Sequence, residues 1–126
     1  MPNSNTMRII TFIIYILSFV GSAFAAHLHP EKHYQEHWCK DHGGVTEYVL
    51  VDKSRVDCLT DTHAIEVEFA PKWKEAVGQA LYYSIKTNRK PGIVVISENP
   101  ESDAKHIKRL RTVTEKYGIE LFEVIR

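Results

Sequence analysis

The sequence has no excess of charge of either sign: its 126 residues include 16 lysines and arginines and 16 aspartates and glutamates. No net field would steer such a chain toward polyanions, so a nucleic-acid partner would have to be held by a local basic patch. Hydrophobic residues make up 44% of the chain, which excludes a disordered or collagen-like protein and indicates a globular one.

The sequence also lacks an apolar run long enough to cross a membrane. Its longest run, Ile9 to Val20, is shorter than the ~20 residues of a spanning helix. Arg8 precedes this run and the small-x-small pattern Ala23-Phe24-Ala25 follows it, a layout typical of a secretory signal. We therefore expect a signal peptide at residues 1–25, a single domain at residues 26–126 and a periplasmic or secreted protein without stable membrane insertion. A retained membrane anchor is the alternative.

Cysteine is scarce, and both cysteines, Cys39 and Cys58, lie in the part expected to be exported, where a disulfide can form. A bridge would close a loop of 19 residues, which the chain-entropy model values at roughly 3 kcal/mol. Two buried thiols are the alternative, because spacing alone does not give the Cα separation that a bridge demands.

Hydrophobic periodicity and turn residues predict the element order α-β-β-β-α-β-α-β. The expected ranges are 30–42, 45–51, 55–59, 63–69, 71–88, 93–96, 101–117 and 119–125. In the second helix, apolar residues recur every four positions from Trp73 to Ile85. An early antiparallel meander followed by a right-handed β-α-β crossover predicts an α/β fold with a mixed central sheet and helices on its faces.

The second expected hairpin brings acidic residues together. If Asp61 and Thr62 form its loop, Asp57 pairs with Glu66, with Cβ atoms ~5 Å apart, where like charges are destabilising. Glu68 lies on the same face, two residues along the strand. A hard divalent cation such as Mg²⁺ or Mn²⁺ would neutralise these carboxylates and could polarise a phosphate. The solvated face of an exposed hairpin is the alternative.

The following helix carries Lys72, Gln79 and Tyr83 near one face, at spacings that could bring them to the acidic residues. The alternative is that Lys72 is merely solvated and Gln79 is a surface amide. Together, Asp57, an eight-residue spacer, Glu66-Val67-Glu68 and the run from Gln79 to Tyr83 resemble the PD-(D/E)XK nuclease superfamily, in particular branches with a glutamine-tyrosine helix motif.

This resemblance implies a restriction-endonuclease-like core, with Asp57 and Glu66 as ligands of Mg²⁺ or Mn²⁺ and the Val67 carbonyl assisting. It also implies that Gln79 and Tyr83 line the site. Glu68 stands where the family has a lysine, and a carboxylate cannot support an attacking hydroxide as an ammonium can. We expect Lys72 to supply that function.

The family often adds an acidic residue from the first helix. Glu36 is the first candidate for that residue in this sequence, and Glu31 is the second.

Histidine is concentrated early in the domain: five of the seven histidines lie between His27 and His42. His33 and His37 have the spacing that can present two imidazoles to one zinc ion, but the sequence offers no complete ligand set. A polar, exposed helix face is the alternative.

Other catalytic signatures are absent, since no serine lies in a glycine-rich elbow and no phosphate-binding loop occurs. Basic residues cluster at the end of the second expected helix and along the third, and could contact a phosphate backbone or could be solvated faces. These are Lys86, Arg89 and Lys90, and Lys105, Lys108, Arg109 and Arg111.

We expect an exported, metal-dependent nuclease that hydrolyses the phosphodiester bonds of nucleic acid, with DNA as the first expectation. Two alternatives stay open. One is an inactive nuclease-fold module that binds nucleic acid or protein, and the other is a periplasmic, histidine-rich metal-binding protein.

Overall fold

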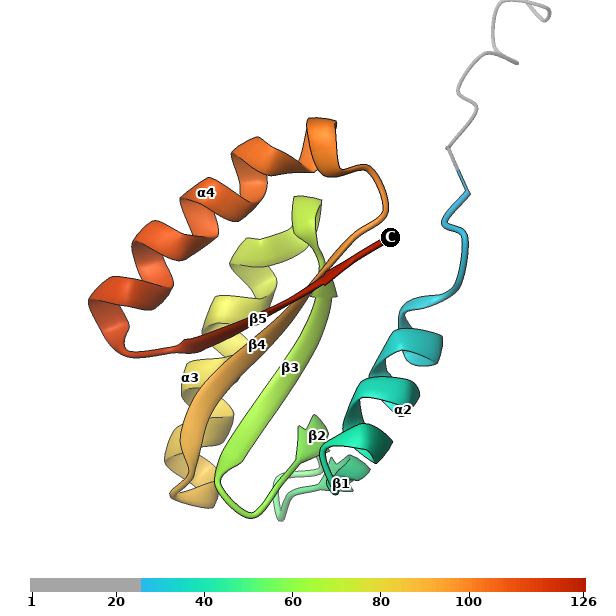
Figure 1. Ribbon diagram of the computed structural model, residues 1–126. Coiled ribbons are helices and arrows are strands. Elements are labelled where there is room, and N and C mark those ends of the chain that lie inside the picture. Colours follow the sequence, from blue (N-terminus) through green and yellow to red (C-terminus); the bar gives the residue numbers. More distant parts are fainter. Residues whose placement is uncertain (1–25) are drawn as a thin grey trace, which may run out of the picture.

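The computed structural model describes residues 26–126, which form a five-stranded mixed sheet with three α-helices (Figure 1). The expected α/β class is confirmed. The signal peptide predicted at residues 1–25 lies outside the described residues. Within residues 26–126, no helix is both long and apolar enough to cross a membrane.

The observed element order is the predicted one. The elements are α2 (Glu31–Asp41), β1 (Val45–Val49), β2 (Arg55–Leu59), β3 (His63–Phe69), the 3₁₀ turn η1 (Ala70–Lys72), α3 (Trp73–Thr87), β4 (Lys90–Ser97), α4 (Pro100–Tyr117) and β5 (Glu120–Ile125). β1 is shorter than expected because a turn begins at Leu50, whose N–H bonds the Ser54 carbonyl at 2.8 Å. β4 extends beyond its apolar centre at both ends.

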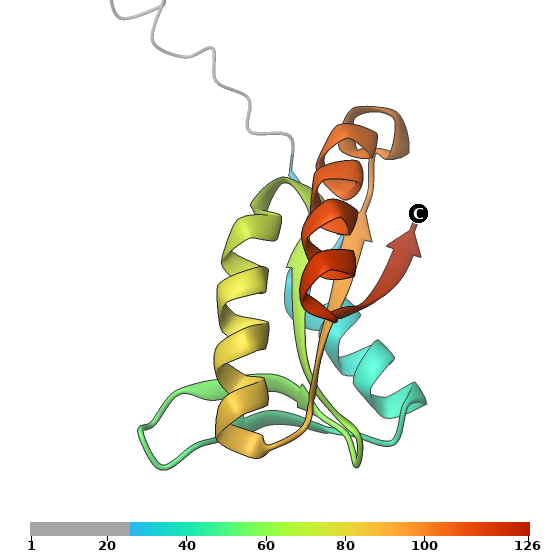
Figure 2. The ribbon, with the colours of Figure 1, turned by 90° about the vertical axis from the view of Figure 1, so that its left-hand side faces the viewer.

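The strands lie in the order β1-β2-β3-β4-β5, with antiparallel pairing from β1 to β3 and parallel pairing from β3 to β5. β2 and β3 pair only at Cys58↔Ile65 and Leu59↔Ala64, and the same register continued by one residue puts Asp57 opposite Glu66. In Figure 2 the β1–β2 hairpin turns away from the direction of β3 and β4. The two strands therefore separate just beyond this pair.

The helices cover the two faces of the sheet, with α2 on one side and α3 and α4 on the other (Figure 1). Alternate residues of β4 serve the two faces: Val94 and Ile96 pack toward α2, whereas Ile93 and Val95 pack toward α3 and α4. A strand buried on both faces needs apolar residues at every position, which explains the continuous apolar run predicted there.

The contact face of α3 differs from the predicted apolar stripe. Its buried residues are Ala76, Ala80 and Tyr83, whereas Ile85 is 78% exposed. A four-residue repeat drifts around a helix that has 3.6 residues per turn, so a stripe that begins at Trp73 leaves the sheet before Ile85. The small alanines instead allow the helix to approach the strands closely.

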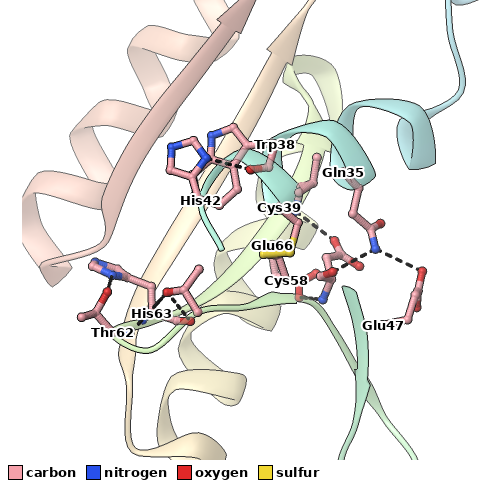
Figure 3. Close-up of a disulfide and its surroundings, with 12 residues drawn as sticks. Gln35, Trp38, Cys39, His42, Glu47, Cys58, Thr62, His63 and Glu66 are labelled. Atoms are coloured by element: carbon pink, nitrogen blue, oxygen red, sulfur yellow. Dashed lines mark hydrogen bonds between the residues drawn. A yellow bond between two sulfur atoms is a disulfide. The ribbon is translucent and has the colours of Figure 1, made fainter. Parts of the chain in front are cut away.

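Cys39 and Cys58 form a disulfide that joins α2 to β2, with their Cα atoms 5.7 Å apart. Both residues are fully buried, and Figure 3 shows the bridge between the helix and the strand. Gly44 packs directly on it: a Cβ atom at this position would lie 2.4 Å from the Cys58 Sγ and 2.7 Å from the Cys39 Sγ. The covalent link therefore also depends on a residue without a side chain.

Candidate functional site

Asp57 and Glu66 face each other where β2 leaves β3, as the predicted register requires. The Asp57 N–H donates to Glu66 Oε1 at 3.3 Å, and the Val67 N–H donates to Asp57 Oδ2 at 2.9 Å. These side-chain bonds replace the backbone ladder, which stops at Cys58 and Ile65. The N–H and C=O of a strand residue point to the same edge, so the Val67 carbonyl also faces this gap.

Glu66 is a buried carboxyl group, with only 3% of the residue exposed. Burial, and then the charge of Asp57, raise its pKa to about 10. Burial also raises the pKa of Asp57, although the hydrogen bond from the Val67 amide opposes that shift. The alternative of an exposed, solvated hairpin face is therefore wrong for Glu66.

The first residue of α2 adds a carboxyl group to this pair. Glu31 lies beside Glu68, and burial, its side-chain interaction with Glu68 and the charges of Glu68 and Asp57 raise its pKa to about 8. Glu68 Oε1 also accepts the Phe69 N–H at 2.9 Å. We call Glu31, Asp57, Glu66 and Glu68 the acidic cluster.

The expectation that Glu36 is the first-helix acid is wrong, and Glu31 takes its place. Glu36 is 57% exposed and lies 3.8 Å from the Lys32 ammonium on the outer face of α2. The two glutamates are five residues apart on a helix with 3.6 residues per turn, so they point in different directions. The packing of α2 against the sheet decides which of them faces the cluster.

Lys72 lies in η1, directly before α3, and is exposed. Its positive charge opposes the rise in the pKa of Glu31, so the ammonium lies within electrostatic reach of the acidic cluster, although Lys72 forms no ion pair among residues 26–126. The neighbouring Lys74 instead holds its ammonium 5.7 Å from the centre of the Trp73 ring. Of these two lysines, Lys72 is the one near the carboxyl groups.

The two members of the helix motif are placed differently. Tyr83 is buried at the site, and burial together with the charges of Glu66 and Asp57 raises its pKa. Gln79 is exposed and is not among the residues that line the cleft described below. The structure thus brings Tyr83 to the acidic cluster but leaves Gln79 one turn away on α3.

Sequence reasoning missed two residues of the site, Gln35 and Glu47. The Gln35 side chain, on a residue only 2% exposed, donates to the Asp57 carbonyl at 2.9 Å and to Glu47 Oε1 at 3.2 Å (Figure 3). Glu47 lies opposite Asp57 on β1 with a left-handed φ of 53°, and its charge helps to raise the pKa of Asp57. The four-residue spacing of Glu31 and Gln35 was the available signal for Gln35.

These groups open into a cleft of about 660 Å³ between α2, the β1–β2 hairpin and α3. Its lining residues are Pro30, Glu31, Lys32, Gln35, Glu47, Lys53, Ser54, Arg55, Asp57 and Tyr83. None of the basic residues singled out in the sequence lies in it. Two of them have partners elsewhere, since Arg89 donates to the Thr60 carbonyl and Arg111 pairs with Glu123.

The donor atoms suit Mg²⁺ or Mn²⁺ in their chemistry, because both ions favour carboxylate and carbonyl oxygens. In residues 26–126, however, no three histidine, cysteine or acidic side chains are arranged to hold a metal ion. Asp57 and Glu66 bond backbone amides here, so both would have to turn toward an ion. Their raised pKa values mean that a cation would displace protons on binding.

The histidine row on α2 likewise forms no complete metal site within the described part of the chain. The His33 and His37 ring centres are 4.4 Å apart, and His29 stacks on His33 at 4.2 Å. The pKa of His33 is lowered by desolvation and by the neighbouring histidines. Zinc binding by these residues stays a prediction.

The fold and the cleft define a small α/β protein with acidic side chains gathered where two strands separate. The chain is similar to two proteins of Acanthamoeba polyphaga mimivirus that are named for a KilA-N domain. One is 33% identical over 91 residues, which cover 72% of this chain and 35% of the relative. The other is 31% identical over 91 residues, covering 72% of this chain and 24% of the relative.

This chain thus spans about a third or less of the length of these curated relatives. No protein-family model matches the chain, and no solved structure matches it.

Proposed function

We propose that this protein is a metal-dependent nuclease of the PD-(D/E)XK type, which hydrolyses phosphodiester bonds of nucleic acid outside the cytoplasm. The observation that carries the proposal is the pairing of Asp57 with the buried Glu66 at the point where β2 and β3 separate. Acidic groups held this close repel each other when ionised, and a bound cation would relieve that repulsion. The resemblance of the sequence motif supports the same assignment.

In this proposal Asp57, Glu66 and the Val67 carbonyl hold Mg²⁺ or Mn²⁺. The ion supplies a charge that polarises the phosphate and lowers the pKa of a bound water. Lys72 replaces the family lysine lost at Glu68, and its ammonium near Glu31 supports that role. Tyr83 borders the carboxyl pair, while Gln79 is free on the surface of α3 to meet a substrate that covers the cleft.

Nucleic acid is proposed as the substrate from the nuclease resemblance together with the KilA-N domain in the names of both relatives. DNA is the first substrate to test, and RNA is the second. Export is proposed from the signal peptide predicted at residues 1–25. The Cys39–Cys58 disulfide supports it, because such bonds persist mainly in oxidising compartments.

The test is cleavage of plasmid DNA and of an RNA oligonucleotide by the purified protein, with Mg²⁺, with Mn²⁺ and with EDTA. We expect cleavage that needs the metal and is abolished in both Asp57→Asn and Glu66→Gln. Circular dichroism checks that each variant is folded. Cleavage that persists in folded forms of both variants would contradict the assignment of the site.

A second candidate is the same fold retained as a non-catalytic module that binds nucleic acid. Glu68 at the lysine position favours it, as does the absence of a three-ligand metal arrangement within residues 26–126. This candidate predicts that the wild-type protein binds DNA equally well with Mg²⁺ and with EDTA and leaves it intact.

A further inference from the structure

The tip of the β1–β2 hairpin, residues 50–55, is one wall of the cleft and carries two of its three basic residues. We propose that this hairpin tip is a preformed arm for the phosphodiester backbone of nucleic acid. In this assignment Lys53 and Arg55 contact phosphates from one wall, and Lys32 of α2 contacts them from another. The inference rests on the proposed function, for which it assigns the substrate-binding residues.

Position in the cleft is the first argument. Lys32, Lys53 and Arg55 line the same cleft as Glu31 and Asp57. The side chains of Lys32 and Arg55 are 67% and 63% exposed, so these cations face solvent while the paired carboxyl groups lie deeper. A polyanion that enters the cleft therefore meets these cations, and the Glu47 carboxylate beside Arg55, before the deeper pair Asp57 and Glu66, and the cations offset its repulsion from the acidic groups.

The second argument is that these cations are available. The Arg55 Nε lies 3.8 Å from Glu47 Oε2, and the Lys32 Nζ lies 3.8 Å from Glu36 Oε1. Exposed pairs of this length contribute little to stability and are easily exchanged for a phosphate. Lys53 forms no ion pair with any residue between 26 and 126.

The third argument is that the tip is held in one conformation. The Lys53 N–H donates to the Leu50 carbonyl at 3.0 Å, and Asp52 Oδ1 accepts the Ser54 N–H at 3.0 Å. The Tyr82 hydroxyl of α3 donates to the other oxygen of Asp52. Hydrogen bonds from the Ser54 hydroxyl, the Tyr82 hydroxyl and the Ser54 N–H hold the pKa of Asp52 near 2, so it accepts them as a carboxylate across the whole physiological range.

Lys53 itself has a left-handed φ of 73°, a conformation that is unfavourable for a residue with a side chain. The hydrogen-bonded turn maintains that conformation. A side chain whose backbone is already ordered loses less conformational entropy when it binds, so the turn favours affinity without adding a contact.

Contacts to the phosphate backbone carry no sequence information, so the arm would bind nucleic acid regardless of base sequence. The basic residues of α4 provide a matched control. Lys105 and Lys108 are exposed, carry the same charge and do not line the cleft.

The experiment measures binding of a fluorescein-labelled DNA duplex in EDTA over a range of NaCl concentrations. For the double variant Lys53→Glu/Arg55→Glu we expect affinity at least tenfold weaker than wild type and a salt-dependence slope lower by about 2, one per lost phosphate contact. The control Lys105→Glu/Lys108→Glu removes the same charge and should stay within about twofold of wild type. Equal weakening in the two double variants, or wild-type binding by the hairpin variant, would overturn the proposal.

The variant Tyr82→Phe separates positioning from charge. It removes the hydroxyl that anchors Asp52 and leaves every cation in place. We expect binding about threefold weaker because the arm must be ordered on binding, with an unchanged salt slope. A reduced slope in Tyr82→Phe would contradict a purely positioning role.

Parallel cleavage assays with Mg²⁺ distinguish this inference from the proposed function. If wild type cleaves DNA and the hairpin variant binds and cleaves equally well, the arm is wrong and the nuclease assignment stands. If wild type binds DNA through the hairpin but never cleaves it, the arm stands and the nuclease assignment is wrong. A wild-type protein that binds no DNA at low salt overturns the arm.

Discussion

At the scale of single residues, the site is defined by carboxyl groups that keep their protons. Burial raises the pKa of Glu66 to about 10 and that of Glu31 to about 8. In the unfolded chain both groups ionise near their ordinary pKa of about 4.5. As the pH rises above that value the unfolded state releases protons that the folded state retains, so stability must fall.

This linkage predicts a pH dependence for the metal-free protein. The contribution of Glu66 to the free energy of unfolding is fully present below pH 4.5. This contribution is lost as the pH rises toward the pKa of about 10 that Glu66 has in the folded state. One such group accounts for at most about 1.4 kcal/mol per pH unit. Urea unfolding in EDTA between pH 5.5 and pH 8 should show this decline in the free energy of unfolding for the wild type. The decline should be smaller for Glu66→Gln. Glu75→Gln, an exposed site on α3, is the control and should match wild type.

Lys72 offers a second test at this scale. Lys72→Ala should slow single-turnover cleavage by about 10²-fold or more, since it removes the ammonium proposed to support the attacking water. Mn²⁺ affinity should not fall, because an ammonium is not a metal ligand. Lys74→Ala is the control, because that ammonium lies over the Trp73 ring. Equal cleavage rates in the two variants would show that Lys72 has no special role.

At the scale of elements, the site depends on where β2 stops pairing with β3 and on how α2 is held. The Cys39–Cys58 disulfide joins α2 to β2 next to Asp57, and the Gln35 amide makes a second link from the same helix. α2 in turn supplies Glu31 to the acidic cluster. The position of one acidic residue therefore depends on a covalent bond about two turns further along its helix.

The disulfide prediction follows from this arrangement. Replacing both cysteines by serine should lower the free energy of unfolding by about 3 kcal/mol, as expected for a loop of 19 residues. It should also weaken Mn²⁺ binding, because Cys58 directly follows the proposed ligand Asp57 on β2 and the bridge holds that part of the strand. Urea unfolding and metal titration with and without a reductant measure both effects. The reductant should lower the stability and the Mn²⁺ affinity of the wild type but not those of the serine variant. If both quantities stay the same in the reduced wild type, the structural role of the bridge is contradicted.

The elements were more predictable from the sequence than the site. Local periodicity and turn residues specify the order of elements, and the short loop after Thr60 specifies the register that pairs Asp57 with Glu66. The selection of Glu31 over Glu36 depends on how α2 rotates against the sheet, which no local pattern contains. The place of Glu47 in the site depends on its own left-handed backbone conformation within β1, and the neighbouring residues in the sequence give no signal for that conformation.

At the scale of the whole molecule, helices on both faces bury the sheet. The carboxyl groups lie in the gap between β2 and β3, and the cleft connects them to solvent. Electrostatic repulsion in that gap and the stability of the fold are therefore linked. A ligand that binds only the folded state raises the free energy of unfolding in proportion to the logarithm of its concentration. A cation in this gap would do so and would also remove the repulsion.

Metal binding should consequently be visible as stability, independent of any catalytic activity. If the affinity for Mg²⁺ is ~1 mM, adding 10 mM should raise the free energy of unfolding by about 1.4 kcal/mol. The gain should be larger at pH 8 than at pH 6, because protons compete with the ion for the same oxygens. Urea unfolding measures it, and the double variant Asp57→Asn/Glu66→Gln should show no gain at either pH. An equal gain in that variant would place the ion elsewhere and leave the two facing carboxyl groups without the ligand proposed for them.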